Sequence, residues 1–472
     1  MTAAMRRGHI GRIQEFSTLN TNDLTQGSIL KSLLRFFFPI LFGMLFQQLY
    51  NTVDAVVVGR VVGPEALAAV GGSPAVIINL VIGVFTGLAS GATVIISQYF
   101  GLRDDERLSR AVHTILIFCL LAGVVLTLLG RLSAVWSLRL VKTPGDILAL
   151  SGRYLRIYYL GAVPLLLFNV ASGILRAVGD SRRPLYYLGV CCGMNIALDL
   201  LFVAVLQMGV DGVAWATVVS QLTGAVLILL RLGRSNGPER MELRKLRIDA
   251  ASLRRILYIG VPAAIQGAMY SVSNLLIQSA INDFGTTVVA AWTAISKFDG
   301  VFWVTSNSFG AAICTFVGQN FGAGKYERMR EGVRKWLLTT LGTAIVMSAL
   351  LIGLSRWGLR LFTTDAAVIE EATRMMWYFV PFYALWSFIE IISNTLRGAG
   401  DAIAPTVISL IGVCVLRILW IALLVPHWHT VMGISVSYPA TWFITAAAFV
   451  VYYYRSDWLK RCAGHRLERS KI

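Results

Sequence analysis

Charged residues are scarce in this sequence. Asp, Glu, Lys and Arg together make up 14% of its 472 residues, whereas a soluble globular domain carries about a quarter. The chain also lacks an HExxH motif, a GxSxG motif and a P-loop, since the glycine-rich run that begins at Gly322 has the wrong spacing. We therefore expect a protein that is neither soluble nor an enzyme and that needs no cofactor beyond a coupling ion.

The sequence also lacks a pattern that would pair its cysteines. The six cysteines show no CxxC spacing, and five of them lie inside apolar segments. A thiol in such a segment behaves as a small hydrophobic group. We expect no disulfides.

Long apolar runs dominate instead. The chain is 56% hydrophobic, with a mean hydropathy of +0.68, and a helix that spans a bilayer needs about 20 mostly apolar residues. The first run follows a polar, basic segment and is too long for a cleaved signal peptide. We predict an all-α integral membrane protein with twelve transmembrane helices, at about 31–57, 72–98, 110–130, 154–175, 185–206, 212–231, 254–282, 288–317, 334–354, 374–396, 405–425 and 431–454.

The basic residues predict the orientation. With an even number of spans, both termini lie on one side, and most of the 42 Lys and Arg residues fall on that side, in clusters at 240–255, 325–335 and 455–471. Positive residues collect on the cytoplasmic side. The net charge of +17 is thus explained by topology and by anionic lipid. We expect a multi-pass protein of the inner (cytoplasmic) membrane with cytoplasmic termini and no nucleic-acid partner.

The chain contains an internal repeat. The motif at 98–107 reappears 221 residues later at 319–328, and the motif at 175–180 reappears at 396–401. Pro39 in the first span aligns with Pro262 in the seventh. A duplication of six spans gives two halves of the same orientation, related by a pseudo-two-fold axis along the membrane normal.

The repeat sets the expected domain organisation. Halves of this kind enclose a substrate path at their interface. We expect a cytoplasmic N-terminal segment (1–30), an N-lobe (31–231), a basic cytoplasmic linker (232–253), a C-lobe (254–454) and a basic cytoplasmic tail (455–472).

Polar residues inside the N-lobe spans call for a reason, because a charge at mid-membrane costs roughly 2.5–3.5 kcal/mol. One face of span 1 is polar, span 5 carries two polar residues at i, i+4, and span 6 adds a hydroxyl. Their oxygens suit Na⁺, or a carboxylate pair that shares a proton; the alternative is that they only join helices by hydrogen bonds. The proposed coupling residues are Asp54, Asn195, Asp199 and Thr217, with Gln47, Tyr50 and Asn51 as the supporting polar face.

These residues are not duplicated. Asp54 aligns with Ile277, Asn195 with Leu416 and Asp199 with Trp420. A purely structural role is expected in both copies, so the difference favours a specialised role for the N-lobe.

The C-lobe spans carry a second polar set: Lys297, Asp299, Glu390 and Arg417. Cross-helix salt bridges are one explanation, and substrate contact by an acid is the other. Glu390 is the strongest candidate because aromatic residues crowd its span, and aromatic faces hold cations. We include Asp299, Asn274 and Tyr270 as further candidate contacts. Over all spans, acids outnumber bases four to two, which argues against a polyanionic substrate.

Pro39 gives span 1 a weak point. Proline removes one backbone hydrogen bond and clashes with the preceding turn. Because Asp54 lies further along the same helix, we propose that Pro39 is a hinge that responds to the charge state of Asp54. A static kink is the alternative.

These features resemble the multidrug and toxic compound extrusion (MATE) family in its bacterial form, over about residues 28–455. The matching pattern is Pro39 before Asn51-Thr-Val-Asp54, Gly-Gln-Asn-Phe-Gly-Ala at 318–323, Leu-Arg-x-x-Gly-Asp in both halves, and Asn195-Ile-Ala-Leu-Asp199.

The resemblance implies a V-shaped pair of six-helix lobes. Such a protein exports organic cations by alternating-access antiport with Na⁺ or H⁺, and Asp54, Asn195, Asp199 and Thr217 match the relatives' N-lobe cation site. We expect a monomer in a lipid bilayer with a small organic substrate. Some Na⁺-coupled relatives carry a carboxylate in the seventh helix, and here none occurs at 258–282. The alternative is a flippase for lipid-linked saccharides on the same fold superfamily.

Overall fold

The computed structural model describes residues 23–428 and 430–469, and every regular element in that part of the chain is a helix. Most of the predicted N-terminal segment and the end of the basic tail lie outside the described residues. The first half contains α2 (Ile29–Val57), η2 (Val58–Val62), α3 (Pro64–Gly71), α4 (Ser73–Leu102), α5 (Asp105–Leu140), α6 (Gly145–Tyr158), η3 (Tyr159–Gly161), α7 (Ala162–Ala177), α8 (Arg182–Asp199), η4 (Leu200–Val205) and α9 (Val210–Gly233).

The second half repeats this order after a short turn, η5 (Leu243–Lys245), in the linker. It contains α10 (Ala250–Asn282), α11 (Thr286–Phe298), α12 (Gly300–Gly322), α13 (Tyr326–Gly353), α14 (Ser355–Leu359), α15 (Ala366–Phe379), η6 (Val380–Phe382), α16 (Tyr383–Ala399), α17 (Ile403–Ser409), η7 (Leu410–Val415), α18 (Leu416–Leu423), α19 (Val425–Trp428), α20 (Val431–Arg455) and α21 (Trp458–Arg469).

Twelve helical segments of the described chain are long and apolar enough to cross a membrane, which confirms the predicted all-α, twelve-span fold. One predicted span was wrong in detail. The segment 288–317 is divided at Asp299, and the apolar helix that qualifies as a span is Gly300–Gly322. Gly300 is a weak helix former, and the Asp299 side chain is held by neighbouring aromatic donors. Lys297 lies near the end of α11, before this apolar helix, and its side chain is exposed.

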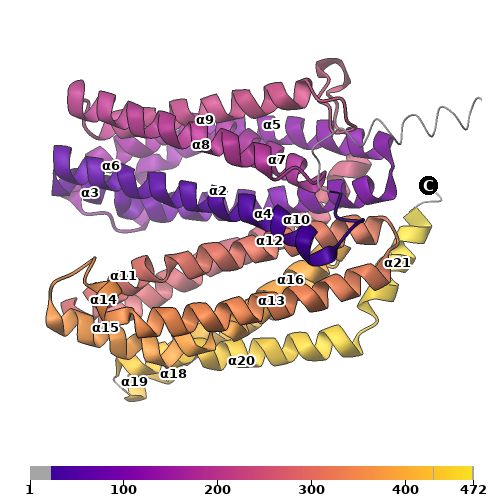
Figure 1. Cartoon of the computed structure of the whole chain (residues 1–472). Coiled ribbons are helices and arrows are strands. Elements are labelled where there is room, and N and C mark those ends of the chain that lie inside the picture. Colours follow the sequence, from indigo (N-terminus) through magenta and orange to yellow (C-terminus); the bar gives the residue numbers. More distant parts are fainter. Residues whose placement is uncertain (1–22, 429, 470–472) are drawn as a thin grey trace, which may run out of the picture.

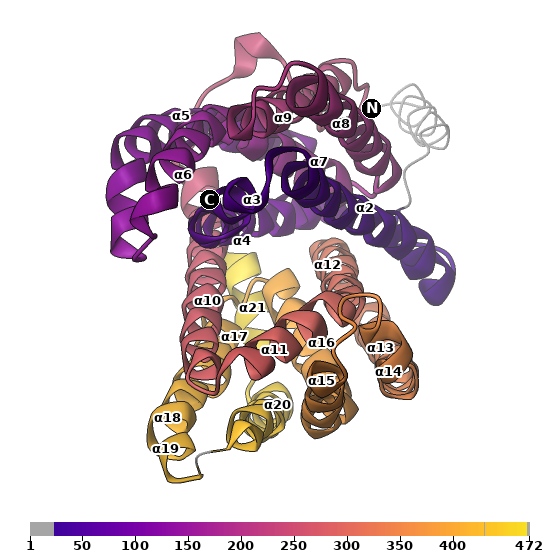
Figure 2. The ribbon, with the colours of Figure 1, turned by 90° about the vertical axis from the view of Figure 1, so that its left-hand side faces the viewer.

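The two halves form two lobes that face each other (Figure 1). At their interface α4 packs along α10 and α12, and α2 packs against α12. Figure 2, which looks along the helices, shows α2 and α4 on one side of this interface and α10 and α12 on the other. Spans 1 and 2 thus meet spans 7 and 8, which are their own counterparts in the repeat. This arrangement is the one expected of halves related by an axis along the spans.

The duplicated glutamines link the lobes at one end of the molecule. We call this end, where residues 23–28 and α21 lie, the terminal end (Figure 1). Nε2 of Gln98 donates to the carbonyl of Gly398 at 2.9 Å, and Nε2 of Gln319 donates to the carbonyl of Ala177 at 2.8 Å. Donors and acceptors are both related by the 221-residue repeat. The two copies of the motif therefore bind each other's lobe in a symmetric pair.

The duplicated glycines of the same motif allow this close approach. A Cβ on Gly101 would lie 1.9 Å from the carbonyl oxygen of Gln319, and a Cβ on Gly322 would lie 2.0 Å from that of Gln98. No side chain fits such a gap, so both positions need glycine in this conformation. The repeat therefore encodes a tight, two-fold contact between α4 and α12 at the terminal end.

Residues 23–28 add a strap across the terminal end. Leu24 is fully buried; its N–H donates to Oε1 of Gln319 at 3.0 Å, and its carbonyl accepts from Nδ2 of Asn320 at 3.2 Å. Asp23 pairs with Arg103 of the N-lobe at 2.5 Å. The segment is thus bonded to both lobes and reinforces the contact between them.

Candidate functional site

The predicted coupling residues of the N-lobe meet at the ends of two helices. Asp54 lies near the end of α2, and Asn195 and Asp199 lie one turn apart at the end of α8, which packs against α2. The Asp54 carboxylate lies against the side chains of both Asp199 and Asn195. Asp199 is 0% exposed and Asn195 is 1% exposed. The i, i+4 pattern of the sequence therefore converges on one buried cluster.

The cluster is short of partners. Five polar atoms of the cluster are buried and have no hydrogen-bond partner among the described residues: Oδ1 of Asp54, both carboxylate oxygens of Asp199 and both polar atoms of the Asn195 side chain. Buried polar groups in proteins are nearly always paired, and a buried unpaired charge is costly. Two carboxylates and an amide with unused oxygens fit a monovalent cation or a shared proton. The described residues contain no group of three or more His, Cys, Asp or Glu that could hold a metal ion.

The helices change pitch next to both acids. The π-helical segment η2 begins one turn after Asp54, and the π-helical segment η4 begins directly after Asp199. Segments of π-helix inside α-helices occur frequently at functional sites. They leave the backbone around the two carboxylates less regular than the rest of each span.

The supporting residues are placed unequally. Gln47 and Tyr50 are half-buried and lie beside each other on the cluster's side of α2. Asn51, which shares this helix face by spacing, has an exposed side chain. Thr217 is buried on α9, which packs against α8, and its hydroxyl donates to the carbonyl of Val213 at 3.0 Å.

Two tyrosines near the cluster were missed from the sequence. Tyr154 and Tyr158 lie one turn apart on α6 with ring centroids 6.1 Å apart, and Tyr158 is close to both Tyr50 and Asp54. Their i, i+4 spacing predicts that the two tyrosines share one face of a helix. Nothing in the sequence alone places α6 beside α2.

A cavity of about 880 Å³ lies at the interface of the lobes, and the C-lobe supplies most of its wall. All four predicted substrate contacts line it: Tyr270, Asn274, Asp299 and Glu390. None of Asp54, Asn195, Asp199 or Thr217 does. The structure therefore separates the candidate coupling cluster from the candidate substrate cavity.

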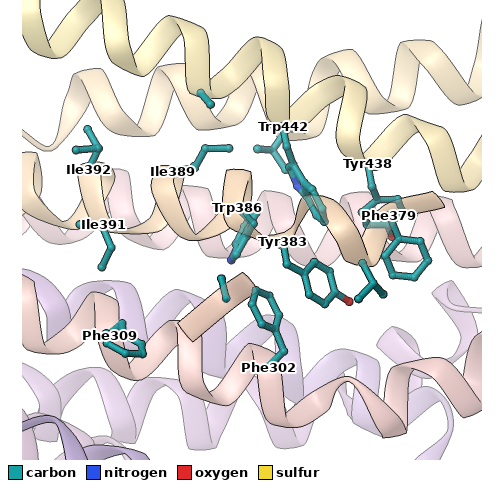
Figure 3. Packing of buried hydrophobic residues seen from close by; sticks show 14 of the residues in the cluster. Phe302, Phe309, Phe379, Tyr383, Trp386, Ile389, Ile391, Ile392, Tyr438 and Trp442 are labelled. Atoms are coloured by element: carbon teal, nitrogen blue, oxygen red, sulfur yellow. The ribbon is translucent and has the colours of Figure 1, made fainter. Parts of the chain in front are cut away.

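Figure 3 shows an aromatic cluster of the C-lobe that includes Tyr383 and Trp442, and Asp299 is hydrogen-bonded to the Tyr383 of this cluster. Oδ2 of Asp299 accepts hydrogen bonds from the Tyr383 hydroxyl at 2.5 Å and from Nε1 of Trp303 at 3.0 Å, while Oδ1 is buried without a partner. Tyr383 stacks on Phe302 at 3.9 Å, and its ring lies 5.9 Å from that of Trp442. Asp299 is thus a carboxylate with one free oxygen inside an aromatic pocket.

Glu390 belongs to a chain of side-chain hydrogen bonds. Nδ2 of Asn394 donates to Oε1 of Glu390 at 2.8 Å, and Nη1 of Arg397 donates to Oδ1 of Asn394 at 3.5 Å. Nη2 of Arg397 also donates to Oε1 of Gln266 at 2.7 Å, and Nε2 of Gln266 donates to the Tyr270 hydroxyl at 3.0 Å. The positive charge of Arg397 offsets part of the charge of Glu390.

The charge balance of the cavity corrects the sequence argument. Over the spans, acids outnumber bases, but the cavity wall holds the two acids Asp299 and Glu390 against three arginines: Arg176, Arg397 and Arg417. Arg176 and Arg397 belong to the repeated Leu-Arg motif at the ends of spans. Both lie at the ends of spans, where a basic residue is also explained by topology, whereas the structure places both in the wall. The wall therefore offers binding groups of both signs.

Salt bridges do not explain the C-lobe set. In the part of the chain that the structure describes, no ion pair involves Lys297, Asp299, Glu390 or Arg417. The charges of Asp299, Glu390 and Arg417 are therefore not neutralised by ion pairs with described residues.

Comparison with known proteins gives one consistent family. A family model described as MatE matches residues 39–201 and 262–423, once in each half. The probable multidrug resistance protein YoeA of Bacillus subtilis is 30% identical, over 94% of this chain and 97% of its own. The probable multidrug resistance protein NorM of Thermotoga maritima is 24% identical, over 94% of this chain and 96% of its own.

Solved structures agree on the fold. A structure of a multidrug resistance MATE family transporter in an outward-facing conformation is 24% identical and superposes with a TM-score of 0.87, over 94% of this chain and 99% of its own. A MATE structure in a bent conformation is 25% identical with a TM-score of 0.86, over 94% of this chain and 100% of its own. The alternative of a lipid-linked saccharide flippase gains no support from these relatives.

Proposed function

The chain belongs to the MATE family of multidrug efflux transporters, and from that premise we propose that it exports organic, cationic compounds by alternating-access antiport with Na⁺ or H⁺. The observation that carries the proposal is the unpaired Asp54–Asn195–Asp199 cluster inside the N-lobe. An ion that binds there satisfies oxygens that the fold leaves unsatisfied. The protein acts in the cell membrane as a multi-pass transporter with cytoplasmic termini.

Helix α2 connects the proposed coupling cluster to the proposed substrate cavity. It carries Asp54 near one end and Met44 in the cavity wall, where the Met44 sulfur accepts a hydrogen bond from the Ser308 hydroxyl at 3.3 Å. Pro39 lies further along the same helix. Occupation of the cluster by an ion can therefore reach the cavity through one helix, and Pro39 as the hinge is part of this proposal.

The contact at the terminal end determines to which side of the membrane the cavity opens. The lobes are joined by the two glutamine bonds and the strap at the end that carries the termini. With cytoplasmic termini, this conformation closes the cytoplasmic side and is the one that releases substrate outward. The alternating-access cycle then requires that the terminal end opens.

Cation-dependent dye efflux in reconstituted vesicles tests the function. We expect an imposed Na⁺ or proton gradient to drive export of a monocationic dye. One charge that crosses ~100 mV is worth about 2.3 kcal/mol. Two ions per dye, carried by Asp54 and Asp199 together, would therefore make export faster at an inside-negative voltage clamped with valinomycin. Export indifferent to voltage would leave one ion per cycle, and no export under either gradient would overturn the function.

Glu390 is the acid that we propose as the main contact of the cationic substrate. Glu390→Gln keeps the size of the side chain and the hydrogen bond to Asn394 but removes the charge, so we expect export of a monocationic dye to fall about ten-fold, and export of a neutral dye of similar shape to change little. Glu370→Gln, at an exposed position on α15, is the matched control. Equal losses for both dyes would assign Glu390 a structural role.

A further inference from the structure

Arg417 is the least expected group in the cavity. It lies on α18, its side chain is 4% exposed, and it contributes to the cavity wall. Its guanidinium lies over the ring of Tyr438 at 4.0 Å and lies 5.9 Å from the centroid of Trp442. Nη2 donates to the hydroxyl of Thr441 at 3.1 Å. The stacked rings and this one hydrogen bond fix the plane of the guanidinium group.

The charge of Arg417 has no counter-ion. Among the described residues, no carboxylate lies within ion-pairing distance of it, and its Nε is buried without a hydrogen-bond partner. A buried charge without a partner is destabilising, and aromatic faces compensate it only in part. The fold does not require this cation, since the equivalent position of the first half, 221 residues earlier, is Ile196. Function is therefore the better explanation of its presence.

Guanidinium chemistry specifies the missing partner. The group presents N–H donors in a rigid plane that matches a carboxylate in bidentate fashion. Arg417 uses one of these donors for Thr441, and the rings of Tyr438 and Trp442 cover its face rather than its donor edge. An anionic group in the cavity would accept hydrogen bonds from Arg417 and supply the opposite charge that no described residue provides.

Asp299, an acid that lines the same cavity, is linked to the same rings, because it accepts a hydrogen bond from Tyr383, whose ring lies 5.9 Å from that of Trp442. Tyr438 lies close enough to both Arg417 and Asp299 for their charges to act on its hydroxyl. Its ring lies 5.5 Å from that of Trp442. Asp299 keeps one unpaired oxygen. The cavity wall thus brings together an arginine without an ion pair, aromatic faces and a carboxylate with one unpaired oxygen.

We infer that Arg417 is a binding subsite for the carboxylate of zwitterionic aromatic substrates, whose cationic part is held by Asp299 and Glu390. This inference rests on the proposed export function and narrows its substrate class. Compounds that carry both a cationic nitrogen and a carboxylate satisfy both signs of the wall, whereas simple cations leave Arg417 unpaired.

Two rhodamine dyes that differ only in one ester test the subsite. One has a free carboxylate and is a zwitterion; the other is its methyl ester and a simple cation. In vesicles with the wild-type protein, we expect both to be exported. Arg417→Gln should reduce export of the free acid about ten-fold or more, the loss of one charge-assisted pair, and leave the ester unchanged. Arg417→Lys should recover part of the loss, because it restores the charge but not the planar fork.

Controls separate the subsite from the overall function. Arg360→Gln, at an exposed arginine, should leave both dyes unaffected. Equal effects of Arg417→Gln on both dyes, or a loss for the free acid at Arg176→Gln and not at Arg417→Gln, would overturn the assignment. Binding of both dyes to the purified protein, measured by fluorescence polarisation, gives a readout that does not need transport. A wild-type protein that exports neither dye would contradict the proposed function, while loss of binding selectivity in Arg417→Gln would still support the subsite.

Discussion

Asp54→Asn and Asp199→Asn are each expected to reduce gradient-driven efflux to the level of empty vesicles. The two side chains lie against each other, and three of their four oxygens are buried without hydrogen-bond partners. Asparagine keeps the size of the side chain but removes the charge that attracts a cation and the site that accepts a proton. Without ion binding, the gradient has no group through which to act, whereas substrate binding in the separate cavity should persist.

The measurement combines efflux with binding. Each variant is reconstituted with an imposed Na⁺ or proton gradient, and dye binding to the purified protein is measured in parallel. Asp283→Asn, an exposed carboxylate at the end of α10, is the matched control and should behave as wild type. Normal efflux in both Asp54→Asn and Asp199→Asn would remove the cluster from the mechanism.

Much of the fold was predictable because the thickness of the bilayer fixes the length of apolar sequence that a spanning helix needs. Runs of about 20 apolar residues gave all twelve spans, and the repeat at 221 residues gave two lobes. The division at Asp299 was not predictable from hydropathy, because apolar residues continue across it. At this point Trp303 and Tyr383 donate hydrogen bonds to the Asp299 carboxylate, and these contacts leave no trace in hydropathy.

The N-lobe cluster was more predictable than the cavity. Asp199 and Asn195 share one helix face by spacing alone, and only the packing of α2 on α8 had to be added. Arg176 and Arg397 carry no such signal. They lie at the ends of spans, where basic residues are also explained by topology, and only the crossing of helices at the interface places them in the cavity wall.

The separation of cluster and cavity has a mechanistic consequence. No candidate coupling residue lines the cavity, so ion and substrate do not compete for one carboxylate in this conformation. Ion binding can therefore affect substrate binding only by moving helices that belong to both sites. Helix α2 is one of these helices. For the antiport proposed above, a gate that opens only when those helices move is therefore needed, and we propose the terminal end as this gate.

Gly101→Ala and Gly322→Ala are expected to block the cycle by holding this gate open. Each new Cβ would lie about 2 Å from a carbonyl oxygen of the other lobe, at 1.9 and 2.0 Å, and helix backbones cannot yield locally by that much. The lobes must then separate at the terminal end, which also breaks the bonds made by Gln98 and Gln319. Transport should fall at least ten-fold, because a transporter that cannot close one end cannot alternate.

Spin labels report the expected separation directly. Glu106 and Glu327 are exposed, lie at the terminal end and are related by the repeat, so cysteines placed there and labelled give one distance across the gate. Cys462, the one described cysteine that is not buried, is replaced by Ser. We expect a longer distance in both glycine variants than in wild type. Gly342→Ala is the matched control, because a Cβ at this helical glycine meets no atom within 4 Å, and it should leave distance and transport unchanged. Wild-type transport together with a wild-type distance in Gly101→Ala would show that the lobes do not need this contact.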